Sequence, residues 1–202
     1  MNTIRQRILD AAERVIRTKG LAAASTREIA REAGCADGTL YNHFADRVDL
    51  FVAVVLDKLP DFTEAFSKLP YQVGEGTVQS NLEAVAQVAL SFHYQTAPLS
   101  CSLFAEPELL RRYHEALKAQ NRGPYGSVKS LEAYLRAEQR LGRVDARADP
   151  LVAAAMLMGT CFWEAYRIHF RGETSTPESD RHLVEVLVQS LMGGLAPREP
   201  QQ

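Results

Sequence analysis

The sequence predicts an all-α protein with a small N-terminal helical domain and a larger C-terminal helical domain. Apolar residues recur with a helical period along almost all of the 202 residues, as Ile4, Ile8, Ala11 and Val15 do. Glycine and proline stand between the periodic segments, where helices start and stop. No segment alternates apolar and polar residues between hairpin turns, so the sequence does not favour strands.

The first four predicted helices are bounded by capping and stop residues. We expect them at residues 3–19, 26–33, 37–43 and 47–69. Gly20 follows the last basic residue of the first helix and stops it. Ser25 and Glu28 form a capping box that starts the second helix, and Gly34 ends it. Asp46 is expected to cap the fourth helix.

The remaining helices are separated by proline and glycine. We expect them at residues 78–94, 102–120, 125–141, 151–170 and 177–195. Residues 69–77 form a linker. Pro98 is expected to interrupt the helical pattern after the fifth helix, and Pro107 to break the pair of helices that follows. Asp149 and Pro150 open the eighth helix, and Pro177 suits the first turn of the ninth. Residues 196–202 are expected to be a frayed tail.

Composition is that of an ordinary globular chain, with 46% hydrophobic residues and a net charge of −2. The first 50 residues carry eight Lys or Arg against seven Asp or Glu, so a DNA-binding N-terminal part is permitted but not required. Cys35, Cys101 and Cys161 form no paired motif, which favours a reducing cytosol. The apolar run from Leu151 to Trp163 is too short to span a bilayer. We therefore expect a cytoplasmic protein.

Enzyme motifs are absent from the sequence. It contains no GxSxG, HExxH, Walker loop, GxGxxG or CxxC pair, and its five histidines lack the spacing of metal ligands. We expect no catalytic residues, no metal and no cofactor.

The second and third helices carry more polar and aromatic groups than packing requires. The surplus consists of Arg27, Thr39, Tyr41, Asn42 and His43. Hydroxyl groups donate to phosphates, and arginine and asparagine pair with guanine and adenine edges. Two short helices joined by a glycine turn have the dimensions of a helix-turn-helix. This surface therefore suits double-stranded DNA.

The stretch TREIAREAGCADGTLYNHFADRVDLF resembles the DNA-binding signature of TetR-family transcriptional regulators, with TLYNHF and DLF its most specific parts. The resemblance implies phosphate contacts from Thr26, Thr39, Tyr41, His43 and Arg47. It implies base or groove contacts from Arg27, Asp37, Gly38 and Asn42. Three alternatives remain open: Asp37 could cap the third helix, His43 could pack between helices, and Tyr41 could lie at the rim of the small core.

The resemblance also implies a division of labour along the chain. Residues 1–46 would form the DNA-binding domain, and residues 47–195 a domain that binds a small apolar or amphipathic ligand and dimerises. The candidate ligand-binding residues are Phe62, Phe66, Phe92, Phe104, Tyr113, Tyr125 and Trp163. His93, His114 and Glu164 could add polar groups to this cavity.

The last two helices are expected to form the homodimer interface. The helix from Leu151 to Phe170 is apolar on nearly all sides, and the helix from Pro177 to Leu195 carries leucines at four-residue steps. The two helices resemble the dimerising pair of the TetR family, and the resemblance implies a four-helix bundle with the same pair of a second copy.

The sequence thus predicts a bacterial homodimeric repressor that a small molecule releases from a palindromic operator. Two alternatives share the fold: an activator-type regulator, and a helical small-molecule-binding protein that no longer contacts DNA. Loss of Arg27, Thr39, Tyr41 and Arg47 without a change in DNA affinity would favour the last.

Overall fold

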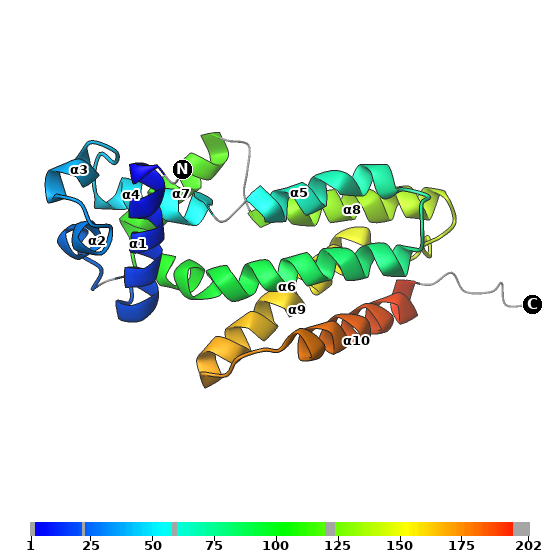
Figure 1. The fold of residues 1–202 in the computed structure, drawn as a ribbon. Helices are drawn as coiled ribbons and strands as arrows, with labels where there is room; N and C mark the ends of the chain where they lie inside the picture. Colours follow the sequence, from blue (N-terminus) through cyan, green and yellow to red (C-terminus); the bar gives the residue numbers. More distant parts are fainter. Residues whose placement is uncertain (1–2, 22, 58–59, 120–123, 196–202) are drawn as a thin grey trace, which may run out of the picture. The chain divides into compact units, whose positions relative to one another are not determined.

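Helices form the regular structure in the described part of the chain, residues 3–21, 23–57, 60–119 and 124–195 of the computed structural model (Figure 1). In chain order they are α1 (Ile4–Lys19), α2 (Thr26–Glu32), α3 (Asp37–Tyr41), α4 (Arg47–Asp57), α5 (Pro60–Lys68), the 3₁₀ helix η1 (Leu69–Gln72), α6 (Val78–Leu103), α7 (Pro107–Ala119), α8 (Pro124–Arg140), α9 (Pro150–Arg171) and α10 (Pro177–Leu195). These residues include no strand, so the all-α prediction is confirmed. None of the described helices is long and apolar enough to cross a membrane.

The chain packs as two units. Unit 1 comprises Met1–Leu59 and Thr96–Arg122, and unit 2 comprises Pro60–Gln95 and Gly123–Gln202. Helix α6 contributes residues to both. The functional division after residue 46 stays a prediction, and the expected tail lies outside the described residues.

Unit 1 is a small helical core around α1. This helix packs against α2 and α4, and α4 also packs against α7. Ile8, Ile29, Leu40 and Leu50 are completely buried between these helices. The start of α2 at the Ser25 cap is confirmed, because Ser25 Oγ accepts from the Glu28 backbone N–H at 3.2 Å. The Glu28 carboxylate accepts from the Ser25 hydroxyl at 3.4 Å.

Unit 2 is a larger helical layer in which α9 packs against α8 and α10, and α8 packs against α5. Its core includes the fully buried residues Leu82, Leu90 and Leu157. The carboxylate of Glu138, on α8, is also fully buried. It accepts from the Gly74 backbone N–H at 3.1 Å and pairs with Arg143 at 3.2 Å, so the buried charge is compensated.

The single helix predicted at residues 47–69 is wrong in part. Helix α4 ends at Asp57 and α5 begins at Pro60, while residues 58 and 59 lie outside the described residues. Proline cannot donate a helical hydrogen bond but suits the first turn of a new helix. Pro60 therefore starts a second helix instead of lying inside a long one.

The interruption predicted at Pro98 is also wrong, because α6 continues through it to Leu103. A proline inside a helix leaves the carbonyl four residues earlier without its N–H donor. Here that carbonyl belongs to Tyr94, and His169 Nε2 lies 2.8 Å from its oxygen. Because a carbonyl only accepts, the His169 ring donates and replaces the missing helical bond.

Candidate DNA-binding surface and ligand region

The turn between α2 and α3 is held from below by α1. Gly34 adopts a left-handed conformation, with φ of +66°. The Nη2 atom of Arg7 donates to the Ala33 carbonyl oxygen at 2.6 Å. A Cβ on Gly34 would lie only 3.1 Å from this Arg7 nitrogen. Glycine is therefore favoured here by its backbone conformation and by the neighbouring arginine.

One face of the α2–α3 pair is apolar and buried, and the opposite face is polar and exposed. Ile29, Ala30 and Leu40 have no exposed surface. Arg27, Asp37, Gly38, Asn42 and His43 are exposed, Thr26 and Thr39 are half-buried, and Tyr41 is 53% exposed. The polar surplus of the sequence therefore lies on one outer surface.

Two of the predicted contact residues are joined on this surface. The hydroxyl oxygens of Thr26, on α2, and Tyr41, on α3, lie 3.3 Å apart. The side chain of His43 is exposed, so it does not pack between helices as one alternative proposed. Two hydroxyl groups presented together are suitable donors for a phosphate.

Asp37 does not cap α3, so that interpretation of its role is wrong. The helix begins at Asp37 itself, and the preceding Ala36 has the extended backbone of an N-cap, with φ of −72° and ψ of 151°. Asp37 lies in the first turn, where its negative charge favours the positive end of the helix dipole.

Arg47 is used inside the protein. Its Nη2 atom donates to the Leu21 carbonyl oxygen at 2.6 Å, and its guanidinium carbon lies 5.0 Å from the centre of the Phe51 ring. These contacts tie the start of α4 to the loop after α1. A phosphate contact from Arg47 stays a prediction that would have to coexist with them.

The neighbouring Asp46 caps the start of α4 and also pairs with α7. Its Oδ1 accepts from the Asp49 backbone N–H at 2.8 Å, as a capping residue does. Arg112 of α7 donates to both carboxylate oxygens, at 2.8 and 2.7 Å. The Asp49 N–H and Arg112 lower the pKa of Asp46.

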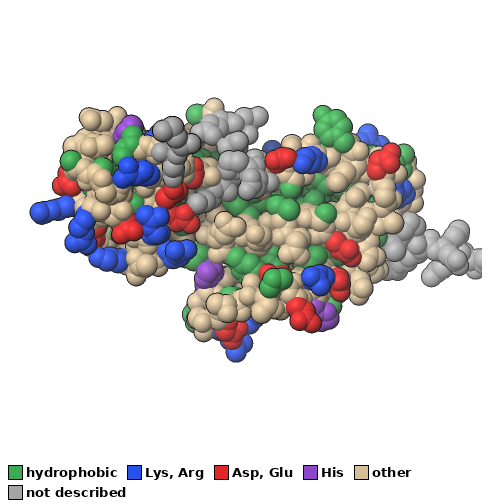
Figure 2. All heavy atoms as spheres, in the orientation of Figure 1, with side chains coloured by type: hydrophobic (Ala, Val, Ile, Leu, Met, Phe, Trp, Pro, Cys, Tyr) green, Lys and Arg blue, Asp and Glu red, His purple; other side chains and the backbone are tan. Residues whose placement is uncertain are grey.

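Basic side chains gather over the part of unit 1 that contains α1 and α2 (Figure 2). In this part Glu28 pairs with Lys19, and Glu32 pairs with Arg14 at 2.9 Å. Both acidic residues of α2 are thus compensated by α1. Arg27 extends from the same helix as an exposed cation that can reach a nucleic acid.

The predicted ligand-binding aromatics divide into two groups. Phe62 and Phe66 are buried in unit 2, and the Phe62 ring lies 4.7 Å from Phe66 and 4.1 Å from Phe92, measured between centroids. The other four are apart from this cluster. Tyr113 packs in the core of unit 1, while Phe104, Tyr125 and Trp163 are 76%, 73% and 59% exposed.

The same aromatic cluster includes two further rings. His93 lies 6.2 Å from Phe62 and 5.5 Å from Phe162, centroid to centroid. Phe162, on α9, was absent from the predicted set. Its place in the apolar run at 151–163 was visible in the sequence, but the run does not show which of its residues turn toward α6.

Helix α9 has a second apolar face, which is exposed. Ala154, Leu157 and Cys161 face the core of unit 2. The exposed apolar residues are Leu151, Val152, Met156, Phe162, Trp163, Tyr166 and Phe170. The rings of the last three stack in sequence, with 5.8 Å between consecutive centroids. An apolar face of this length on one helix is typical of an interaction surface.

The leucine row of helix α10 faces the core of its own unit, and the place of α10 in a dimer interface stays a prediction. Val184, Val188 and Leu191 are buried in unit 2, and Leu183 and Leu187 pack against the same core. Its leucine row therefore stabilises its own unit. The exposed residues of α10 include Val186, Gln189, Ser190 and Gly193.

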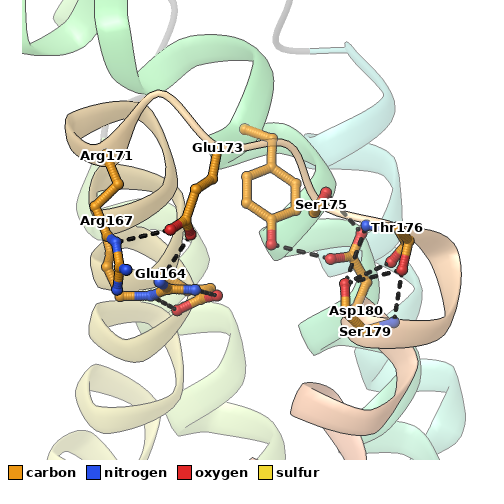
Figure 3. Close-up of polar contacts among 9 residues, drawn as sticks. Glu164, Arg167, Arg171, Glu173, Ser175, Thr176, Ser179 and Asp180 are labelled. Atoms are coloured by element: carbon orange, nitrogen blue, oxygen red, sulfur yellow. Dashed lines mark hydrogen bonds and ion pairs between the residues drawn. The ribbon is translucent and has the colours of Figure 1, made fainter.

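Polar contacts fix the connection between α9 and α10 (Figure 3). Arg167 pairs with Glu164 at 2.7 Å and with Glu173 at 3.2 Å. The Tyr94 hydroxyl, from α6, donates to Asp180 at 3.0 Å. Burial and the Asp180 carboxylate raise the pKa of Tyr94, so it stays a neutral donor. These contacts hold the start of α10 beside α6.

Metal binding finds no support in the described residues, which contain no group of three or more His, Cys, Asp or Glu side chains able to hold an ion.

The chain is similar to known regulators. The family model described as "Bacterial regulatory proteins, tetR family" matches residues 8–54, which contain α2 and α3. The "Fatty acid metabolism regulator protein" of Bacillus subtilis is 25% identical over 154 residues, which cover 76% of this chain and 77% of that protein.

Two solved structures share the whole fold. The fatty acid degradation regulator FadR from Bacillus halodurans superposes with a TM-score of 0.71, at 26% identity, and the match covers 96% of this chain and 97% of that one. FadR from Bacillus subtilis in complex with stearoyl-CoA has a TM-score of 0.69 at 21% identity, over 93% of this chain and 97% of that one. With the exposed polar face of α2 and α3, the match at residues 8–54 and the shared fold support a TetR-family DNA-binding transcriptional regulator.

Proposed function

We propose that the protein is a homodimeric repressor that binds a palindromic operator and is released by a small-molecule ligand. The observation that carries the proposal is the α2–α3 pair, whose buried face is packed and whose outer face holds the polar surplus. Thr26 and Tyr41 would contact phosphates and set the register. Arg27 would pair with guanine and Asn42 with adenine in the major groove.

The exposed apolar face of α9 supports the homodimer. Trp163, Tyr166 and Phe170 form a stacked aromatic row on it, and the outer side of α10 carries small residues such as Ser190 and Gly193. Aromatic anchors against small residues allow two copies of the α9–α10 pair to approach closely in a four-helix bundle. A two-fold dimer presents two recognition helices to successive turns of the duplex.

For the ligand we propose a long-chain acyl-CoA. The relatives of known function named above regulate fatty acid metabolism or degradation, and one of them was solved with stearoyl-CoA. In this chain Phe62, Phe66 and Phe92 gather as an apolar cluster in unit 2. Such a cluster suits a hydrocarbon chain.

Release from DNA would be a population shift. The ligand must bind the arrangement that does not fit the operator more tightly than the arrangement that does. Helix α6 is one route for this coupling, since it carries Phe92 among the unit 2 aromatics and Leu103 in the core of unit 1.

The test is a selection of fragmented genomic DNA of the source organism on the purified protein at about 0.15 M salt, where purely electrostatic binding is weak. We expect enrichment of a few palindromic sites. Adding stearoyl-CoA should release them, whereas free CoA should not. Folded, dimeric and ligand-stripped protein that enriches no site would contradict the operator proposal, and enrichment unaffected by stearoyl-CoA would contradict the ligand class alone.

A further inference from the structure

His93 is a polar group inside an aromatic cluster. Its ring contacts Phe92 edge-on at a centroid distance of 5.3 Å and Phe162 at 5.5 Å, and it is tilted against Phe62 at 6.2 Å. These three phenylalanines come from α6, α9 and α5. The imidazole thus lies where three helices of unit 2 direct aromatic side chains.

The Nε2 atom of His93 has no hydrogen-bond partner among the described residues, although it is buried from solvent. Folded proteins pair nearly all such atoms, and an exception points to a function or to a bound molecule. His169 shows the usual situation in the same unit, since its Nε2 is satisfied by the Tyr94 carbonyl. The Nε2 atom of His93 thus has an unused hydrogen-bonding capacity inside the aromatic cluster.

The charge of His93 limits what that ligand atom can be. Burial lowers the pKa of His93 to about 4, so the ring is uncharged near neutral pH. A neutral imidazole has one donor and one acceptor nitrogen. In the tautomer with the proton on Nε2, that atom donates one hydrogen bond but cannot compensate a buried carboxylate. The matching partner is an uncharged oxygen with apolar groups on both sides.

We propose that His93 is a specificity-determining residue that donates a hydrogen bond to the thioester carbonyl of a long-chain acyl-CoA. The proposal rests on the ligand class proposed above. A thioester carbonyl is an uncharged acceptor between a hydrocarbon chain and a sulfur atom, as a lone donor among Phe62, Phe92 and Phe162 requires. A free fatty acid offers a carboxylate at the same place and would be rejected.

The test compares two probes that differ in one oxygen. Ligand-stripped full-length protein is titrated with stearoyl-CoA and with S-octadecyl-CoA, the thioether that lacks the carbonyl. We expect the wild type to bind the thioester about ten to a hundred times more tightly, as the loss of one buried hydrogen bond implies. His93→Phe should bind the two compounds equally, because its affinity for the thioester falls while its affinity for the thioether stays unchanged.

Two variants control this comparison. His93→Gln retains an N–H donor and should keep most of the preference for the thioester. His182→Phe changes an exposed histidine on α10 and should bind both probes as the wild type does. His93→Phe should unfold at or above the wild-type temperature by circular dichroism, since it removes an unpaired buried nitrogen.

The outcomes separate the two proposals. If His93→Phe keeps the wild-type preference, or loses affinity for both probes equally, His93 does not read the carbonyl, while the acyl-CoA class stands. If the wild type binds both probes equally, the role of His93 is also overturned. If neither probe binds the wild type, the ligand class and the role of His93 fall together.

Discussion

The hydrogen bond from His169 to the Tyr94 carbonyl explains how α6 passes through Pro98, and it can be tested by a double-mutant cycle. His169→Ala removes the donor that replaces the missing helical N–H. The bond is 2.8 Å long but exposed, so water can partly take its place. We therefore expect a loss of about 0.5–1.5 kcal/mol in the free energy of unfolding, the range for one net hydrogen bond.

Pro98→Ala supplies the second arm of the cycle. An alanine at this position can donate its N–H to the Tyr94 carbonyl, which then no longer depends on His169. In the Pro98→Ala background, His169→Ala should consequently cost close to nothing. The expected coupling energy is about 1 kcal/mol, larger than the deviation of about 0.3–0.5 kcal/mol seen for independent sites.

Equilibrium unfolding in urea, followed by far-ultraviolet circular dichroism at one fixed protein concentration, measures all four proteins. If His169→Ala costs the same free energy of unfolding with Pro98 and with Ala at position 98, the reasoning is refuted. The His169 ring would then stabilise the protein in a way unrelated to the proline.

Three further predictions concern the operator, the dimer and the start of α4. Arg27→Ala should weaken operator binding by about 1–3 kcal/mol and relax sequence choice in a mobility-shift assay. Arg31→Ala, at an exposed residue of the same helix, should leave sequence choice unchanged. Equal effects of the two variants would contradict a base contact from Arg27. Trp163→Asp should shift the protein toward monomer in sedimentation velocity. Tyr125→Asp, also at an exposed aromatic residue, should not. If Trp163→Asp leaves the dimer unchanged, the outer face of α9 is not the interface. Asp46→Asn should cost about 0.2–1 kcal/mol at pH 7 through the lost ion pair with Arg112, because asparagine caps a helix about as well as aspartate. Because folding lowers the pKa of Asp46, its contribution to stability is present above the unfolded-state pKa and is lost as pH falls through the folded-state pKa. The free energies of unfolding of the two proteins in urea should therefore converge below about pH 4. A difference that stays constant with pH would contradict this linkage.

Local signals in the sequence determined much of the fold. The capping box at Ser25 and Glu28 places the start of α2, and Pro177 lies at the first position of α10, as predicted. These features depend on residues three or four apart, which a helix brings together whatever the rest of the chain does. The polar surplus on α3 was visible for the same reason, since a five-residue helix cannot bury all of its side chains.

Tertiary structure decided the features that depend on distant residues. The effect of Pro98 depends on His169, and the use of Arg47 depends on Leu21, and neither partner is adjacent in sequence. Helical periodicity also cannot tell a core-facing aromatic such as Phe62 from an exposed one such as Tyr125.

By itself the sequence thus determined an all-α chain with a TetR-type helix-turn-helix, because helix caps, turns and the polar residues of the second and third helices lie within short segments. The tertiary structure alone decided that Phe62, Phe92 and Phe162 meet around His93. It also decided that the leucines of α10 face inward while Trp163, Tyr166 and Phe170 of α9 face outward. The physical reason is that burial and ring contacts arise between helices far apart in the chain, whose mutual rotation no local pattern specifies.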